Sequence, residues 1–188
     1  MKKALVVYGT RYGATANTSD VIADVLRLEG FEVRVMNAKK ESIQSINEYE
    51  LIIIGSGIQM GRWTSEPERF LQKFQKDLSQ KKVAIFVSSG SAHPLSKGED
   101  KIKEINDARI KYLEEKAAKY NLTPIALGLF GGVYDFNKMN WFLRKMMTSI
   151  KIPLEEAGFK DSGTERYETR DFDAIRSWAK KLAQIANE

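Results

Sequence analysis

The chain has 188 residues, of which 43% are hydrophobic and 29% are charged, and its formal net charge is +5. This length and composition are typical of one globular domain with a substantial core, and no apolar run is long enough for a transmembrane helix. Because the chain contains no cysteine, disulfides, Cys-based metal sites and thiol nucleophiles are excluded.

The N-terminus and the charge bear on compartment and partners. Met1-Lys2-Lys3 leads into an apolar run that lacks the length and the cleavage site of a signal peptide, so we expect a cytoplasmic protein. A basic surface attracts nucleic acid, anionic lipid or an acidic partner, but it also serves solubility alone. We expect neither a metal nor a nucleic acid as a partner.

Strand-like and helix-like segments alternate along the chain. Five runs have the composition of strands, namely Lys3–Tyr8, Phe31–Asn37, Leu51–Gly55, Val83–Ser88 and Pro124–Phe130. The first, third and fourth are almost continuously apolar, as in parallel strands that are covered on both faces. Helical periodicity marks Thr15–Glu29, Glu66–Lys76, Glu99–Tyr120 and Phe172–Ala186. The link between strands two and three is shorter, and we expect an irregular segment or a short helical turn around Glu41–Ile46. The alternation predicts a doubly wound α/β domain over residues 1–188, with five parallel strands in the order 2-1-3-4-5.

The loop after the first strand has the sequence Thr10-Arg11-Tyr12-Gly13-Ala14-Thr15. In such a sheet, ligands bind where the loops after strands one, three and four meet. Free N–H groups and the helix dipole favour an anion at a helix start, and two threonine hydroxyls add donors. The loop matches neither a nucleoside-triphosphate P-loop nor a dinucleotide fingerprint. We therefore predict a terminal phosphate here, with an ordinary capped helix start as the alternative.

The loop after the third strand is rich in glycine. Its candidate residues are Ser56, Gly57, Gln59, Gly61 and Trp63. The glycines permit close approach of a ligand to the backbone, and the indole offers a flat surface for an aromatic ring. The alternative is a surface loop whose tryptophan packs onto the core.

The loop after the fourth strand contains Ser89, Gly90, Ser91 and the only histidine, His93. A lone histidine is more often a packing residue than a catalyst, so both roles stay open. Taken together, the three loops fit flavin mononucleotide (FMN). The first loop would hold the phosphate, and the other two would flank the isoalloxazine ring.

Residues 131–170 form an insert between the fifth strand and the last helix, where a minimal fold needs only a short loop. As a helix, Lys138–Ile150 places one apolar face along Met139, Phe142, Leu143, Met146, Met147 and Ile150. Trp141 falls on the opposite face with Arg144 and Lys145, and Tyr134 lies nearby in sequence. Four interpretations stay open: a lid over the flavin, a docking site for an acidic substrate or protein, an interfacial anchor on anionic lipid, and a scaffold helix.

With these motifs in view, the sequence resembles the flavodoxin superfamily. Thr10–Thr15 is similar to that superfamily's Thr/Ser-x-Thr-Gly-x-Thr phosphate loop, with Tyr12 in place of the central threonine. The resemblance is closer to the menaquinone-dependent protoporphyrinogen IX dehydrogenase family. It is carried by Gly9–Thr15 and Ile53–Gly61, which are specific for flavin binding, and more loosely by Tyr134–Met147. Tyr167-Glu168-Thr169 and Trp178 are also similar to that family.

The resemblance implies a flavodoxin-like fold and an FMN-dependent oxidoreductase of heme biosynthesis. Such an enzyme removes hydrogens from protoporphyrinogen IX and passes electrons to a quinone, which would bring it to the inner face of a membrane. The flavin performs the chemistry, so no side-chain catalyst is assigned. The substrate or partner surface would then comprise His93, Tyr134, Trp141, Arg144 and Lys145.

Two other functions use the same fold and cofactor. A flavodoxin-type carrier transfers single electrons without a small-molecule substrate, and an NAD(P)H:quinone reductase needs no further motif. A receiver-type signalling domain is disfavoured, because Ile54-Gly55-Ser56 supplies no phosphoacceptor aspartate at the end of the third strand.

Overall fold

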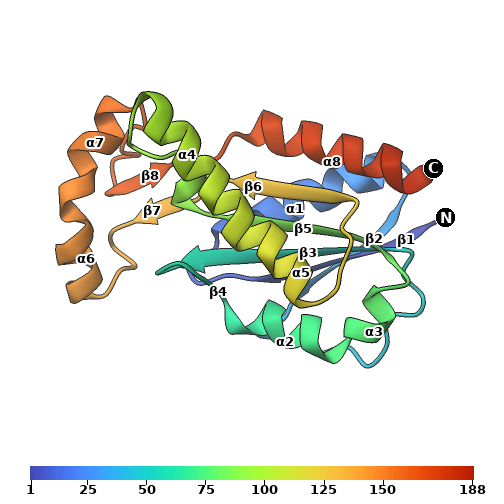
Figure 1. Ribbon diagram of the computed structural model, residues 1–188. Helices are drawn as coiled ribbons and strands as arrows, with labels where there is room; N and C mark the ends of the chain where they lie inside the picture. Colours follow the sequence, from blue (N-terminus) through green and yellow to red (C-terminus); the bar gives the residue numbers. More distant parts are fainter.

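The computed structural model describes residues 1–188 and contains a twisted parallel sheet between two layers of helices (Figure 1). The sheet strands are β1 (Lys3–Gly9), β2 (Glu32–Asn37), β3 (Leu51–Gln59), β5 (Lys82–Ser88) and β6 (Ala126–Phe130). Their order in the sheet is β2-β1-β3-β5-β6. The predicted order is confirmed, because β4 (Arg62–Trp63) is only a short antiparallel addition to the end of β3.

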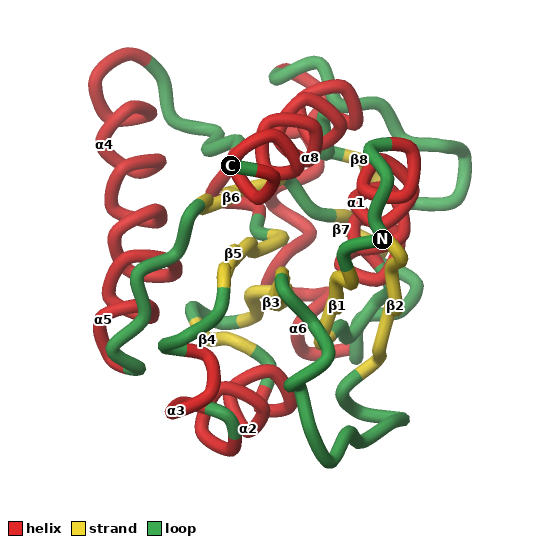
Figure 2. The backbone as a smooth tube through the Cα atoms, turned by 90° about the vertical axis from the view of Figure 1, so that its right-hand side faces the viewer, coloured by secondary structure: helices red, strands yellow, loops and turns green.

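The helices cover both faces of this sheet (Figure 2). One face packs against α1 (Ala14–Leu28) and α8 (Phe172–Asn187), and the other against α2 (Ser65–Lys73), α3 (Gln75–Leu78) and α5 (Glu115–Lys119). Alternation along a strand divides the core between them, because Val6 and Ile53 face the first pair while Val7 and Ile54 face the second group. This two-sided burial explains the continuous apolar runs in the sequence.

Two helical predictions need correction. Glu99–Tyr120 is one helical segment, but α4 (Gly98–Arg109) and α5 are joined by a π-helical turn at Ile110–Glu114. The segment Glu66–Lys76 is interrupted between α2 and α3. Glu41–Ile46 is irregular, which is one of the two expected alternatives; its two isoleucines are buried, and Lys73 Nζ donates to the carbonyl of Ile43 at 2.6 Å.

The insert lies beyond the carboxyl ends of the sheet strands (Figure 1). It contains β7 (Val133–Asp135), α6 (Trp141–Met147), α7 (Lys151–Glu156) and β8 (Arg166–Glu168), and β7 pairs with β8 in a separate antiparallel sheet. Its own small core comprises Phe136, Leu154 and Tyr167.

The helix predicted over Lys138–Ile150 is shorter in the structure. The Oδ1 atom of Asn140 accepts a hydrogen bond from the N–H of Leu143 at 2.8 Å, which starts α6 at Trp141. A 3₁₀ turn at Thr148–Ile150 then joins α6 to α7. The residues before Asn140 therefore lie outside the helix, and the expected continuous face is broken. No helix of the protein is both long and apolar enough to cross a membrane.

Candidate functional site

The loop between β1 and α1 presents an uncapped helix start. Gly13 has a φ of 93°, a left-handed value that suits glycine, and its N–H donates to Thr10 Oγ1 at 3.0 Å. No side chain caps α1, and its first turn holds no acidic residue. The first N–H groups and the positive end of the helix dipole therefore remain available for an anion. The alternative of Thr15 as an N-cap is wrong, because Gly13 occupies that position.

Two glycines bring neighbouring segments close to this loop. A Cβ at Gly9 would lie 2.2 Å from Thr64 Oγ1, so only glycine fits at the end of β1. A Cβ at Gly57 would lie 3.1 Å from Thr15 Oγ1, so the end of β3 lies very close to the start of α1. The structure thus places the first and second loops against each other.

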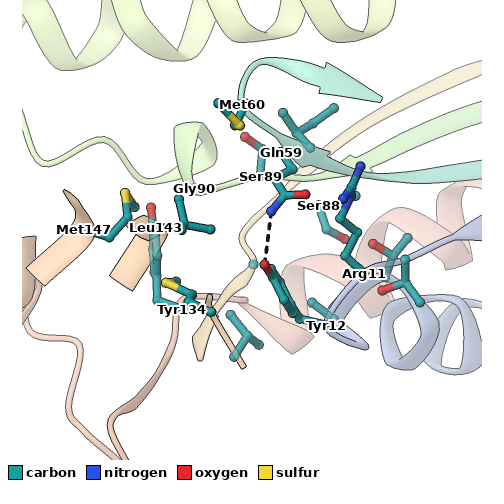
Figure 3. Close-up of a pocket in the computed structure, with 18 of the residues that line it drawn as sticks. Arg11, Tyr12, Gln59, Met60, Ser88, Ser89, Gly90, Tyr134, Leu143 and Met147 are labelled. Atoms are coloured by element: carbon teal, nitrogen blue, oxygen red, sulfur yellow. Dashed lines mark hydrogen bonds between the residues drawn. The ribbon is translucent and has the colours of Figure 1, made fainter. Parts of the chain in front are cut away.

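The β3–β4 hairpin forms the second wall of the site. Met60 and Gly61 make its tight turn, with φ values of 49° and 72°. Gln59 Nε2 donates to the hydroxyl of Tyr12 at 3.1 Å, which links the hairpin to the first loop (Figure 3). Tyr12, the odd member of the phosphate motif, therefore contacts the loop expected to flank the ring.

Trp63 does not lie where a ring-flanking residue should be. Its side chain is buried, and its Nε1 donates to the carbonyl of Tyr112 at 2.9 Å. The Lys116 ammonium lies 5.3 Å from the centre of its ring. The expectation that Trp63 flanks a flavin is corrected, because this side chain anchors the hairpin to the core.

The third loop contributes a buried hydroxyl without a partner. Ser88 Oγ is buried and forms no hydrogen bond within the protein, which is costly unless a ligand or water supplies one. Ser89 Oγ accepts from the N–H of Ser91 at 3.2 Å and so shapes the following turn. A Cβ at Gly90 would lie 1.9 Å from the Tyr134 hydroxyl. Tyr134 therefore packs directly on this loop, and its burial raises the pKa of the phenol.

A cavity of about 240 Å³ joins the three loops to the insert (Figure 3). Its polar and glycine lining comprises Thr10, Arg11, Tyr12, Thr15, Gly57, Gln59, Ser88, Ser89, Gly90 and Gly132, and its apolar lining comprises Ala14, Ile58, Met60, Val133, Tyr134, Met139, Leu143, Met146 and Met147. Arg11 and Ser88 lie toward one side of this space, and Leu143 and Met147 lie toward the other (Figure 3). Such a division suits a ligand with a phosphate at one end and a flat apolar body at the other.

Several of the expected site residues lie outside this cavity. Gly13, Ser56, Gly61, Trp63 and Ser91 do not line it. Among them, Ser56 is buried in a local network, because its Oγ lies 3.1 Å from Thr64 Oγ1 and accepts from the Thr64 N–H at 3.0 Å. These residues shape the loops and do not face the ligand space.

The expected partner surface divides in the same way. Of its five residues, Tyr134 lines the cavity, and His93, Trp141, Arg144 and Lys145 do not. Arg144 is held in an ion pair with Glu165, which also pairs with Lys151 at 2.6 Å. Arg144 is therefore already paired and is not a free cation.

His93 belongs to the third loop but does not line the cavity. Its ring packs edge-on against Phe159, with centroids 5.7 Å apart. Burial lowers the pKa of His93, and nearby Lys101 lowers it further, while Asp171 opposes the shift. This position favours the packing role over direct proton transfer.

The face of α6 that turns away from the cavity is apolar and exposed. Trp141 is 77% exposed and Phe142 is 60% exposed, and their rings meet edge to face at 6.0 Å. The expected arc placed Phe142 with Leu143 and the methionines, but Phe142 does not line the cavity and its ring is exposed. The expectation that Trp141 is tucked against the insert is wrong, because its side chain is exposed.

Sequence reasoning missed the methionine wall of the cavity and the unpartnered hydroxyl of Ser88. The available signal is the helical spacing that groups Met139, Leu143, Met146 and Met147 on one apolar face. This spacing does not predict which part of the protein the face packs against.

The flavodoxin domain family matches residues 5–161 of this chain. The chain belongs to the flavodoxin family. This assignment agrees with the strand order and with a cavity at the carboxyl ends of the strands.

Similar proteins include both enzymes and flavodoxins. The protoporphyrinogen IX dehydrogenase [quinone] of Escherichia coli (strain K12) is 20% identical over 186 residues, which are 99% of this chain and 97% of that protein. The Leishmania major protein of the same name is 24% identical over 185 residues, which are 97% of this chain and 75% of that protein. Among solved structures, a short-chain flavodoxin associated with a non-canonical PDU bacterial microcompartment aligns with a TM-score of 0.60 at 15% identity, covering 99% of both chains. That likeness confirms the fold.

Proposed function

We propose that this flavodoxin-family protein binds FMN and oxidises protoporphyrinogen IX, with a quinone as electron acceptor. The observation that carries the proposal is the two-part cavity, in which an uncapped helix start and an apolar, methionine-rich wall face the same space. The near full-length similarity to two enzymes named protoporphyrinogen IX dehydrogenase [quinone] supports the choice of substrate and acceptor.

The polar end fits the phosphate of FMN. Free N–H groups at the start of α1 and the hydroxyls of Thr10 and Thr15 provide donors, and Arg11 provides a positive charge at the cavity edge. The unpartnered Ser88 Oγ offers a further hydrogen bond inside the cavity. The absence of acidic side chains from the first turn of α1 leaves this charge uncompensated.

The middle of the cavity fits the ring system. Gly57 and Gly90 expose backbone on two sides, and the Tyr134 phenol closes a third. FMN, when bound, supplies the exchange of two electrons with substrate and acceptor. The protein holds the ring and excludes water around it; the raised pKa of Tyr134 keeps its hydroxyl protonated as a neutral hydrogen-bond donor.

The apolar end fits a large, weakly polar substrate. Met139, Leu143, Met146 and Met147 present flexible, polarizable side chains that adapt to the shape of a macrocycle. Each turnover would take two electrons and two protons from the porphyrinogen and deliver them to the quinone, which leaves as a quinol. A one-electron carrier has no need of such a wall.

The exposed face of α6 provides a route to a quinone that is dissolved in a membrane. Trp141 and Phe142 of α6 and Ile152 of the following α7 are large apolar side chains that face solvent, and Lys145 of α6 is exposed as well. Aromatic and basic residues in this combination favour the surface of an anionic bilayer. We therefore propose peripheral contact with the membrane through this face.

Anaerobic reduction of the purified protein tests the function. We expect it to be yellow, to release FMN on denaturation, and to be bleached by protoporphyrinogen IX and reoxidised by menadione. A protein that binds no FMN would overturn the cofactor assignment. Bleaching by NADPH and not by protoporphyrinogen would favour a quinone reductase. Failure of both donors together with a stable one-electron state would favour a carrier.

A further inference from the structure

The segment that follows β8, at the end of the insert, is tied to the first turn of α1 by Arg170. Its side chain is only 3% exposed. Its Nη1 donates to the Ala14 carbonyl at 2.9 Å and to Asn17 Oδ1 at 3.0 Å. Both acceptors belong to the opening turn of α1, and Ala14 itself lines the cavity.

The other side of the guanidinium is fixed as firmly. Its Nε donates to Glu168 Oε1 at 2.7 Å, and its Nη2 pairs with Glu168 Oε2 at 2.5 Å. Its Cζ lies 4.8 Å from the centre of the Phe172 ring. A planar guanidinium with five fixed donors can serve all these partners at once, whereas an ammonium cannot.

The segment that carries Arg170 is itself locked to the start of the insert. Thr169 Oγ1 accepts from the N–H of Gly132 and donates to its carbonyl, both at 3.0 Å. A Cβ at Gly131 would lie 2.1 Å from the Thr169 carbonyl oxygen, so the two segments are in close contact. Arg170 therefore reaches α1 from a rigid platform.

We propose that Arg170 is a positioning residue for the phosphate site. It holds the first turn of α1 so that the free N–H groups and the Thr15 hydroxyl converge on one point. It touches neither the proposed ligand space nor any reacting atom, since it does not line the cavity. The proposal rests on the proposed function to the extent that it places the FMN phosphate at this turn.

Comparison of FMN with riboflavin isolates this role, because riboflavin lacks the phosphate and otherwise has the same ring. We expect Arg170→Met to weaken FMN binding about tenfold, the usual effect of losing the geometry of one charge-assisted hydrogen bond. Riboflavin binding should stay unchanged. Arg170→Lys keeps the charge without the fork, so FMN binding should fall nearly as far. Quenching of flavin fluorescence measures both affinities.

Two further variants complete the experiment. Arg166→Ala removes an exposed arginine from the neighbouring strand β8 and should leave the FMN-to-riboflavin preference unchanged. Asn17→Ala removes one exposed hydrogen-bond acceptor of Arg170 at little risk to folding. Introduced into the native protein, it should lower the preference for FMN over riboflavin; introduced into the Arg170→Met variant, it should have no further effect. This dependence keeps the proposal testable if the Arg170 variants fold poorly.

The outcomes separate the two proposals. Equal losses for FMN and riboflavin, or an unchanged preference in both the Arg170 and the Asn17 variants, would overturn the positioning role alone. A native protein that binds FMN no better than riboflavin would overturn the phosphate assignment, and the role of Arg170 would fall with it.

Discussion

Replacement of Thr15 by valine gives the sharpest test of the phosphate site. Thr15 is buried and lines the cavity, and its hydroxyl forms no hydrogen bond within the protein. Thr15→Val keeps the shape of the side chain and removes only the hydroxyl. The folded protein without ligand should therefore lose little stability, and any loss should appear in ligand binding.

The expected magnitude follows from the charge of the ligand. A hydrogen bond to a charged group contributes about 1.5–3 kcal/mol, which corresponds to a change in Kd of roughly 10- to 150-fold. We expect Thr15→Val to weaken FMN binding by this factor and to leave riboflavin binding unchanged. Titration followed by flavin fluorescence at constant salt measures both ligands.

Thr18→Val is the matched control on the same helix. Thr18 Oγ1 is fully buried and has no hydrogen-bond partner, and the residue does not line the cavity. The same change there should leave FMN binding unaltered and raise the free energy of unfolding by about 1 kcal/mol, because an unsatisfied polar group is removed. Equal FMN affinity in Thr15→Val and the native protein would refute the placement of the phosphate. A loss of affinity in Thr18→Val as large as in Thr15→Val would refute the role of the individual hydroxyl.

Three further expectations follow from the surroundings of the site. Tyr12→Phe and Gln59→Leu each remove the same hydrogen bond, so each should lower the free energy of unfolding by about 1 kcal/mol in urea. The double variant should lose no more than either single variant. Additive losses would contradict a direct hydrogen bond between these two side chains. Replacing Trp141 and Phe142 together by serine should lower cosedimentation with anionic vesicles about tenfold or more, at unchanged FMN content; unchanged cosedimentation would leave α6 without a membrane role. Because the pKa of folded His93 is lowered from 6.5, the unfolded chain takes up the proton first, so stability should fall as the pH drops below about 6.5 and level off below the folded pKa; His93→Gln should flatten this part of the stability curve, and an unchanged curve would refute the assignment.

The sheet could be predicted from the sequence because its signal is local. The runs at β1, β3 and β5 are apolar on both faces, and only a strand with helices above and below uses such a run. The strand order then follows from alternation with helices, but the end of the third strand was wrong, because β3 runs to Gln59 and not to Gly55. The loops after three of these strands were expected to meet, and the structure brings Thr15, Gly57 and Ser89 to one cavity.

The role of Trp63 could not be predicted, because it depends on a partner far away in sequence. Trp63 sits in a glycine-rich loop, as a ring-flanking residue would. Its indole instead finds the Tyr112 carbonyl, which lies in the π-helical turn between α4 and α5. A π turn shifts the register of carbonyl groups within a helix, and no pattern in Glu99–Tyr120 marks where that shift occurs.

The insert shows why hydrophobic periodicity alone left its role open. Alpha-helical spacing groups Phe142 with Leu143 and Met146 in one broad arc, yet Phe142 is exposed at one edge of that arc whereas Leu143 lines the cavity. The seven-residue helix therefore has an apolar cavity wall on one side and exposed Trp141 and Phe142 on the other.

Substitutions on these two sides should separate turnover from membrane binding. If the proposed function is correct, Leu143→Ser should raise the KM for protoporphyrinogen without affecting vesicle binding. The serine replacements at Trp141 and Phe142 should lower vesicle binding and leave that KM unchanged when a water-soluble quinone is the acceptor. Loss of both properties from either side would mean that α6 acts only through its own folding.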